Sequence, residues 1–165
     1  MASVYQMAQS YVEAGFSVIP LRLDGSKAPA LKEWAVYQER QPTPEELAKW
    51  FGRKPKAAIG VVCGTASGNL EVIDHDGEGT LEPYLQIVEI EAPGLMHRLA
   101  IVRTPRPGYH LWYRCDEAIE GNQKLARKWV GGSAPVKTII ETRGQGGQVA
   151  AVGSSLEVHE TRRPY

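Results

Sequence analysis

Two aspartates, Asp74 and Asp76, end the apolar run "NLEVIDHD" with one residue between them. In a β-strand, side chains at positions i and i+2 project to the same face, about 6.5–7 Å apart along the strand. The two carboxylates therefore share a face, and His75 points to the other. Paired carboxylates repel unless a cation lies between them, and hard oxygen ligands suit Mg²⁺, Mn²⁺ or Ca²⁺ better than Zn²⁺. The alternative is a strand that has reached solvent, where Asp-x-Asp-Gly makes a turn.

Two further clusters of polar residues lie at the ends of apolar runs. His110 opens the run "HLWYR" after a turn that contains Arg106 and Gly108, and a histidine at such a position could donate a hydrogen bond to a phosphate. Glu141 and Arg143 share a face at the end of "VKTIIETR", because they are two residues apart. Each cluster also has an ordinary explanation: a histidine satisfied at a sheet edge, and an ion pair at a strand end.

Together, the three clusters supply the groups that metal-dependent phosphoryl transfer needs. This chemistry uses several carboxylates to hold cations about 3.5–4 Å apart, and cationic donors to hold the non-reacting phosphates. Asp74, Asp76 and Glu141 are the candidate metal ligands, and His110 and Arg143 are the candidate phosphate ligands. The presence of all three clusters in one chain indicates this chemistry more strongly than any single cluster does.

The composition is that of a globular protein, because 42% of the 165 residues are hydrophobic and 23% are charged. Cys63 and Cys115 form no C-x-x-C pair, which argues against a disulfide scaffold or a cysteine zinc site. No apolar run approaches the roughly 20 residues of a membrane span. No basic flank precedes an apolar stretch at the N-terminus, so no signal peptide is predicted. We expect one domain over residues 1–165, no membrane partner and a cytoplasmic location.

Charge is distributed unevenly although the net charge is zero. Residues 1–93 carry 8 Lys and Arg against 13 Asp and Glu, whereas residues 94–165 carry 11 against 6. Seven acids and no basic residue lie between Lys56 and Arg98. A domain with one acidic and one basic region is suited to hold cations beside a polyanion. Solvated charges that segregate without a function are the equal alternative.

Local patterns predict an α+β domain. Apolar periodicity and helix caps, such as Thr43 before Pro44 and Gly52 as a stop, predict helices over residues 3–15, 42–52, 80–91 and 122–130. Runs rich in β-branched and aromatic residues predict strands over residues 16–22, 57–64, 69–76, 99–105, 109–115, 136–143 and 147–153. The segments "TASG" and "GQGG" predict tight turns that join 57–64 to 69–76 and 136–143 to 147–153. We expect one mixed or antiparallel sheet with flanking helices.

The order of the motifs resembles that of the archaeo-eukaryotic primase superfamily: Asp-x-Asp on one strand, small-x-His opening a second, and an acid closing a third. More narrowly, the chain resembles the bifunctional DNA primase/polymerase (Prim-Pol) domain of plasmid, phage and prophage replication proteins. The likeness runs from "GFSVIPL", "GSKAPALKEW" and "AAIGVVCGTASGNLEVIDHD" to "RTPRPGYHLWYR", "IIETRGQGGQVAAVGS" and "HETRRPY". It implies an RRM-like catalytic core of the primase type.

The resemblance implies roles for individual residues. Asp74, Asp76 and Glu141 would be catalytic ligands of a two-metal site for Mg²⁺ or Mn²⁺, with Glu141 standing where many family members have aspartate. Gly108 and His110 would form the small-x-His motif, with His110 on the phosphates of the nucleotide. Further nucleotide-binding residues would be Arg143, Arg106 and Lys27. Lys27 lies in "SKAP", which fits a family lysine-x-proline element, and a surface loop lysine is the equal alternative.

The implied function is metal-dependent, template-directed nucleotidyl transfer by a DNA primase/polymerase in the replication of a phage, plasmid or other mobile element, in a bacterial or archaeal cell. Its partners would be single-stranded DNA template and primer, NTP or dNTP, and a helicase domain or protein. The alternative is a non-catalytic nucleic-acid-binding or replication-initiation module on the same fold. Trp112 and Trp129 are candidates for base stacking or for core packing. Basic residues that would follow the template backbone are Arg98, Arg103, Arg106, Lys124, Arg127 and Lys128.

The chain departs from the family pattern at two places. Pro107 and Gly108 stand where a glycine pair often precedes the histidine, and Val152-Gly153-Ser154 replaces the usual Pro-Pro-Ser. Both departures lie outside the metal ligands, so they bear on template and nucleotide contacts. A replication-initiator nuclease is disfavoured, because it needs two histidines separated by one residue. The histidines of this chain, at 75, 97, 110 and 159, include no such pair.

Overall fold

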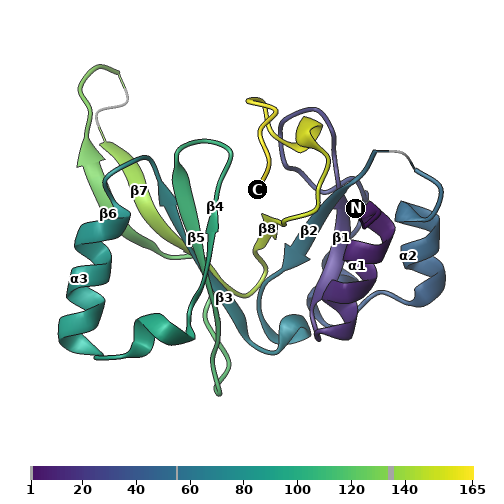
Figure 1. Cartoon of the computed structure of the whole chain (residues 1–165), viewed down its shortest axis with the longest axis horizontal. Helices are drawn as coiled ribbons and strands as arrows, with labels where there is room; N and C mark the ends of the chain where they lie inside the picture. The colour runs from purple at the N-terminus through teal and green to yellow at the C-terminus, as the bar shows by residue number, and fades with distance from the viewer. Residues whose placement is uncertain (1, 55, 134–135) are drawn as a thin grey trace.

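The computed structural model of the chain describes residues 2–54, 56–133 and 136–165. Within them lie three α-helices, α1 (Val4–Glu13), α2 (Pro44–Phe51) and α3 (Leu81–Glu91) (Figure 1). The strands are β1 (Ser17–Leu21), β2 (Ala58–Val62), β3 (Leu70–Asp76), β4 (Ala100–Arg103), β5 (Gly108–Arg114), β6 (Lys124–Trp129), β7 (Val136–Arg143) and β8 (Gln148–Ala150). The predicted α+β class is confirmed, and the strand pairs of both sheets are antiparallel.

Helix α2 begins as its sequence predicts. The side chain of Thr43 accepts a hydrogen bond from the backbone N–H of Glu46, and the Glu46 side chain accepts one from the backbone N–H of Thr43. This capping box satisfies donors that the first turn of a helix leaves unpaired. Pro44 fits the first turn because its missing N–H has no helical partner there. The helix ends before Gly52.

The prediction of a single sheet is wrong, because the strands form two. One sheet has the order β1-β2-β8 and the other the order β4-β5-β3-β7-β6. The segments "TASG" and "GQGG" therefore lead from one sheet to the other and do not close hairpins. Gly64, Gly68 and Gly146 have positive φ angles of 95°, 69° and 81°. Gly64 and Gly68 turn the chain out of the sheet β1-β2-β8, and Gly146 turns it from β7 back toward β8. Of the first predicted hairpin, the described residues retain a single bridge between Gly64 and Leu70.

The predicted helix over residues 122–130 is also wrong, because the structure has strand β6 there. The apolar residues Leu125 and Trp129 are four residues apart, a spacing that is also typical of one face of a helix. In the structure β6 is an edge strand paired with β7, and most of its side chains are exposed. A strand exposed on both faces has no buried side to impose the alternating pattern of a strand on its sequence. Pairing with β7 therefore outweighs the local helical preference.

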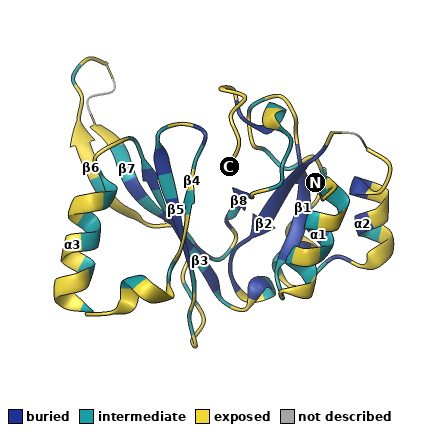
Figure 2. Cartoon of the chain, viewed as in Figure 1, coloured by how far each residue is buried: buried dark blue, intermediate teal, exposed yellow. Residues whose placement is uncertain are grey.

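The main core lies between the smaller sheet and helices α1 and α2, where every residue of β1 and β2 is buried (Figure 2). A second, smaller cluster is centred on Ile73, Leu111 and Ile140 and includes side chains of α3. This cluster covers one face of the larger sheet. On the opposite face Leu70, Val72 and Trp112 belong to the main core, and the half-buried Asp74 and Asp76 follow them at the end of β3. No helix in the described ranges is long and apolar enough to cross a membrane.

Candidate active site

Strand β3 places its two aspartates on one face, as their spacing predicts. Asp74 and Asp76 are half-buried, and both line a cavity of about 150 Å³. His75 is fully buried with its ring on the other face, where Nδ1 lies 3.3 Å from Oγ1 of Thr80. Its ring packs edge-on against Tyr84 in helix α3. Burial lowers the pKa of His75, so its imidazole is neutral and structural at ordinary pH.

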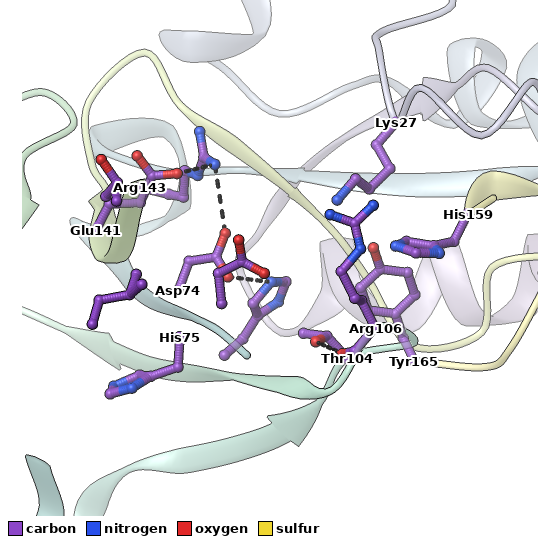
Figure 3. A pocket seen from close by; sticks show the side chains of 13 residues that line it. Lys27, Asp74, His75, Thr104, Arg106, Glu141, Arg143, His159 and Tyr165 are labelled. Atoms are coloured by element: carbon purple, nitrogen blue, oxygen red, sulfur yellow. Dashed lines mark hydrogen bonds and ion pairs between the residues drawn. The ribbon is translucent and has the colours of Figure 1, made fainter. Parts of the chain in front are cut away.

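Strand β7 brings the third acid beside the first. Asp74 and Glu141 are direct neighbours in the β3–β7 register. Arg143 lies between them, with Nη2 2.5 Å from Oε1 of Glu141 and 3.5 Å from Oδ2 of Asp74 (Figure 3). Nζ of Lys137 lies 2.8 Å from Oδ2 of Asp76. All three carboxylates are therefore in contact with cationic side chains.

Strand β5 places His110 on the other side of Asp74. The two residues are direct neighbours in the β3–β5 register, and Nε2 of His110 lies 3.6 Å from Oδ1 of Asp74. The histidine is 5% exposed, and its Nδ1 has no hydrogen-bond partner among the described residues. Burial lowers the pKa of His110 to about 4, although Asp74 opposes that shift. The sheet thus presents a row of His110, Asp74 and Glu141, with a neutral imidazole at one end.

Gly108 lets β3 and β5 approach each other at the edge of the site. It pairs with Asp76 in the register. A Cβ atom at this position would lie 2.3 Å from the backbone oxygen of His75, a distance that real Cβ atoms do not adopt. The small residue two positions before His110 therefore has a packing role. Gly108 is not among the residues that line the cavity, so a contact with nucleotide stays a prediction.

The opposite wall of the cavity comes from segments distant in the sequence. Lys27 and Arg106 lie there with Tyr165 and His159 (Figure 3). Lys27 has a φ of 58°, an uncommon angle for a residue with a side chain, and its backbone oxygen accepts a hydrogen bond from Gln148 in β8. This conformation, held by β8, lets the lysine line the cavity. Arg106 also pairs with Glu160 of the C-terminal segment.

Several residues of the site were missed by the sequence-based reasoning. Lys137 could have been identified as a site residue, because it lies four residues before Glu141 in the same predicted strand and therefore on the same face. Tyr165, His159 and Thr104 carried no local signal as site residues. Tyr165 and His159 reach the cavity because the C-terminal segment folds back over the β4–β5 turn, to which Thr104 belongs. The ring of Tyr165 thereby lies 5.9 Å from that of His110. Burial raises the pKa of Tyr165, so its hydroxyl stays protonated.

The donor set suits a hard divalent cation, because it consists of carboxylate oxygens. Among the described residues, no group of three or more His, Cys, Asp or Glu side chains already surrounds a common cation position. The positive charge beside the acids is supplied by Arg143 and Lys137. Closely spaced carboxylates on one face repel one another unless positive charge lies beside them. Here Arg143 and Lys137 supply that charge, and bound metal ions would supply it equally well.

Carboxylates on adjacent strands, faced by a buried histidine and several cationic side chains, are the arrangement expected of an enzyme that acts on phosphates. The chain belongs to the Prim-Pol family, because the family model of the bifunctional DNA primase/polymerase N-terminal domain matches residues 8–165. The resemblance found in the motifs is confirmed by this match. Membership indicates DNA primase/polymerase activity, with DNA and nucleotides as substrates. No curated protein is a significant match to the chain.

Proposed function

We propose that the domain catalyses metal-dependent, template-directed nucleotidyl transfer from a nucleoside triphosphate, in the replication of a phage, plasmid or other mobile element. The observation that carries the proposal is the row of His110, Asp74 and Glu141 across strands β5, β3 and β7, with Arg143 bridging the two acids. A row of this kind places acidic and phosphate-binding groups within one side-chain length of each other. The resemblance alone supports the mobile-element context and a helicase partner.

Asp74, Asp76 and Glu141 would hold the divalent cations, Mg²⁺ or Mn²⁺. Bound cations would lower the pKa of the attacking 3′-hydroxyl and neutralise negative charge on the triphosphate. Arg143 would then turn from the two carboxylates toward a phosphate, because a guanidinium binds phosphate oxygens as readily as carboxylate oxygens. Lys137 would likewise leave Asp76.

The remaining side chains of the cavity would orient the nucleotide. His110 is neutral above its pKa of about 4, so it would donate a ring N–H to a phosphate without adding charge. Lys27 and Arg106, on the opposite wall, would contribute positive charge to the same phosphate chain. Orientation of reacting groups in this way supplies much of the rate of phosphoryl transfer. Tyr165 would cover His110 and limit access of water.

The proposal is tested by extension of a labelled primer on a DNA template with dNTPs and Mg²⁺ or Mn²⁺. We expect the wild type to extend the primer only with metal, and Asp74→Ala/Asp76→Ala to abolish extension while retaining its fold. The matched control is Asp116→Ala/Glu117→Ala, which removes two exposed acids that do not line the cavity. Extension by the Asp74→Ala/Asp76→Ala variant would refute the proposal. A folded wild type that binds DNA but never extends a primer would favour the non-catalytic alternative.

A further inference from the structure

The β6–β7 hairpin extends from the larger sheet beside the candidate active site (Figure 1). Its outer strand, β6, is an edge strand, and its side chains are exposed except for that of Ala126 (Figure 2). We call residues 124–129 of β6 with 136 and 137 of β7 the basic arm. This is the segment in which a helix was expected from the sequence, so its geometry as an open strand is a finding of the structure.

Among the described residues, three of the four cationic side chains of the basic arm have no acidic partner, and the fourth, Lys137, pairs with Asp76. Residues 121–140 contain four Lys and Arg and no Asp or Glu, in a chain whose net charge is zero. Lys128 lies directly opposite Lys137 in the register, a like-charge pair that costs stability. Within the described residues, no salt bridge involves Lys124, Arg127 or Lys128. Uncompensated charge on an exposed strand fits a polyanion as the partner.

The basic arm is continuous with the site. At its base, Lys124 pairs in the register with Glu141. Lys137 lies opposite Lys128, nearer the far end, and its Nζ reaches Oδ2 of Asp76 at 2.8 Å. From Lys124, β6 runs for about 16 Å along the edge of the sheet, past the acids and beyond them, given a rise of roughly 3.3 Å per residue. A strand of nucleic acid that ends at the acids can therefore lie along the arm.

An exposed aromatic residue stands at the far end of the basic arm. Trp129 is 68% exposed, and its cross-strand neighbour Val136 is 55% exposed. Trp112, by contrast, is buried in the main core, where it packs edge-on against Phe16. Arg127 lies two residues before Trp129 and shares its face of the strand, whereas Lys128 points to the other face. An open indole beside a cationic side chain is suited to stack on a base, and only an unpaired base offers its face. This feature favours single-stranded over duplex nucleic acid.

We propose that the basic arm binds single-stranded DNA on its way to the candidate active site. Lys124, Arg127 and Lys128 would contact phosphates, and Trp129 would stack on an unpaired base. The inference rests on the proposed function for the identity of the strand, which would be the template, but binding itself requires neither metal nor nucleotide.

The test is the affinity for a short fluorescent single-stranded oligonucleotide, measured by anisotropy over a range of salt concentrations without metal or dNTP. Lys124→Ala/Arg127→Ala/Lys128→Ala should bind at least about tenfold more weakly. Its slope of log affinity against log salt should be smaller by about 2, because a single-stranded phosphate contact contributes about 0.7. The matched control is Lys49→Ala/Arg53→Ala/Lys54→Ala, three exposed cationic residues at the end of α2, far from the arm in Figure 1. The control should bind like the wild type.

Trp129→Ala separates stacking from charge. It should weaken binding of the single strand by about 5- to 100-fold, as expected for one lost base–aromatic stack, and leave the salt slope unchanged. Binding of a duplex of the same sequence should be unaffected by Trp129→Ala. If circular dichroism shows that the alanine triple variant is unfolded, it is replaced by the triple variant with glutamine at the same positions. Glutamine keeps a long side chain but carries no charge.

The proposal is overturned if the folded triple variant binds the oligonucleotide as tightly as the control, or if the control loses as much affinity. Failure of the proposed function gives a different result. In that case the wild type would not extend primers, yet binding would still depend on the arm. We also expect Asp74→Ala/Asp76→Ala to retain arm-dependent binding of single-stranded DNA.

Discussion

Arg143 contacts two of the three candidate metal ligands. Its substitution should therefore change both nucleotide binding and metal binding. Its guanidinium compensates Asp74 and Glu141 when no metal is bound, and we propose that it holds a phosphate when metal is present. We expect Arg143→Ala to raise the KM for dNTP by about 10- to 100-fold, the loss of one charged hydrogen bond. It should also lower the Mn²⁺ concentration needed for half-maximal activity, because a competing cation is gone.

Steady-state kinetics with dNTP and Mn²⁺ varied separately measure both effects. Arg143→Lys keeps the charge but loses the planar fork, so its KM should lie between those of the wild type and Arg143→Ala. An unchanged KM for dNTP in Arg143→Ala would show that the residue serves only to neutralise the acids.

Individual site residues could be predicted from the sequence where their spacing along a strand determines which face they share. Asp74 and Asp76, like Glu141 and Arg143, share a face because of the period of a strand, and the structure brings these pairs together with His110 as expected. Tyr165 could not be found in this way. Its place beside His110 depends on the path of a C-terminal segment with no regular structure, which no local pattern encodes.

Gly108 sets how closely strands β3 and β5 can pack. A side chain there would collide with the backbone oxygen of His75, so β3 and β5 would have to separate at the end that carries Asp76. We expect Gly108→Ala to lower the melting temperature and to reduce primer extension below the wild-type level even at temperatures where the variant is folded. Thermal unfolding and extension assays on the same preparation measure the two effects.

Gly121→Ala is the matched control for this variant. A Cβ atom at Gly121 meets one atom, at an ordinary distance of 3.7 Å. Stability and activity of Gly121→Ala should therefore equal those of the wild type. If Gly108→Ala also behaved like the wild type, the close approach of β3 and β5 would not be needed at this position.

The start of α2 makes a pH-dependent contribution to stability. Glu46 accepts hydrogen bonds from Arg40, Tyr37 and the backbone of Thr43, and the contact with Arg40 is the main reason why its pKa falls from 4.5 to about 2. A carboxyl whose pKa is lower in the folded state stabilises the fold above pH 4.5 and loses this effect as the pH falls to about 2. We expect Glu46→Gln to cost about 0.5–1 kcal/mol at neutral pH, as for ion pairs open to solvent.

The measurement is urea unfolding of both proteins over a range of pH. The difference in the free energy of unfolding should be constant from neutral pH to about 4.5 and vanish near pH 2. A difference that does not depend on pH would mean that the geometry of the cap, and not the charge, is what the substitution removes.

Elements with a buried face or a cap were predictable, whereas pairing between them was not. α2 follows from Thr43 and Gly52, and β1 and β2 follow from their apolar runs. The two sheets did not follow, because the glycines that redirect the chain also fit ordinary hairpin turns. Strand β6 did not follow either, since only its partner β7 makes it a strand.

The candidate site lies where several parts of the fold meet. Lys27 comes from the loop after β1, the acids come from the larger sheet, and Tyr165 comes from the C-terminal segment (Figure 3). A nucleotide bound among them would be lost on unfolding of any one part. At a concentration about 100 times its Kd, a ligand stabilises the folded state by about 2.7 kcal/mol, which for this size of chain is about 5–10 °C in Tm.

We therefore expect dNTP with Mn²⁺ to raise the Tm by about this amount, measured by scanning fluorimetry, and Lys27→Ala to reduce the rise at the same concentrations. Lys32→Ala, an exposed lysine of the same loop region that does not line the cavity, is the control and should show the wild-type rise. An equal rise in Lys27→Ala would place the nucleotide away from the loop after β1.

Asp74, Asp76 and Glu141 should bind divalent cations at the positions that Arg143 and Lys137 now compensate. The decisive measurement is binding of Mn²⁺ in the presence of a non-hydrolysable dNTP, followed by the loss of the free-ion signal in electron paramagnetic resonance. We predict that the wild type and the Asp116→Ala/Glu117→Ala control bind Mn²⁺, and that folded Asp74→Ala/Asp76→Ala does not. Equal Mn²⁺ binding by the folded Asp74→Ala/Asp76→Ala variant would show that these carboxylates are not the metal ligands.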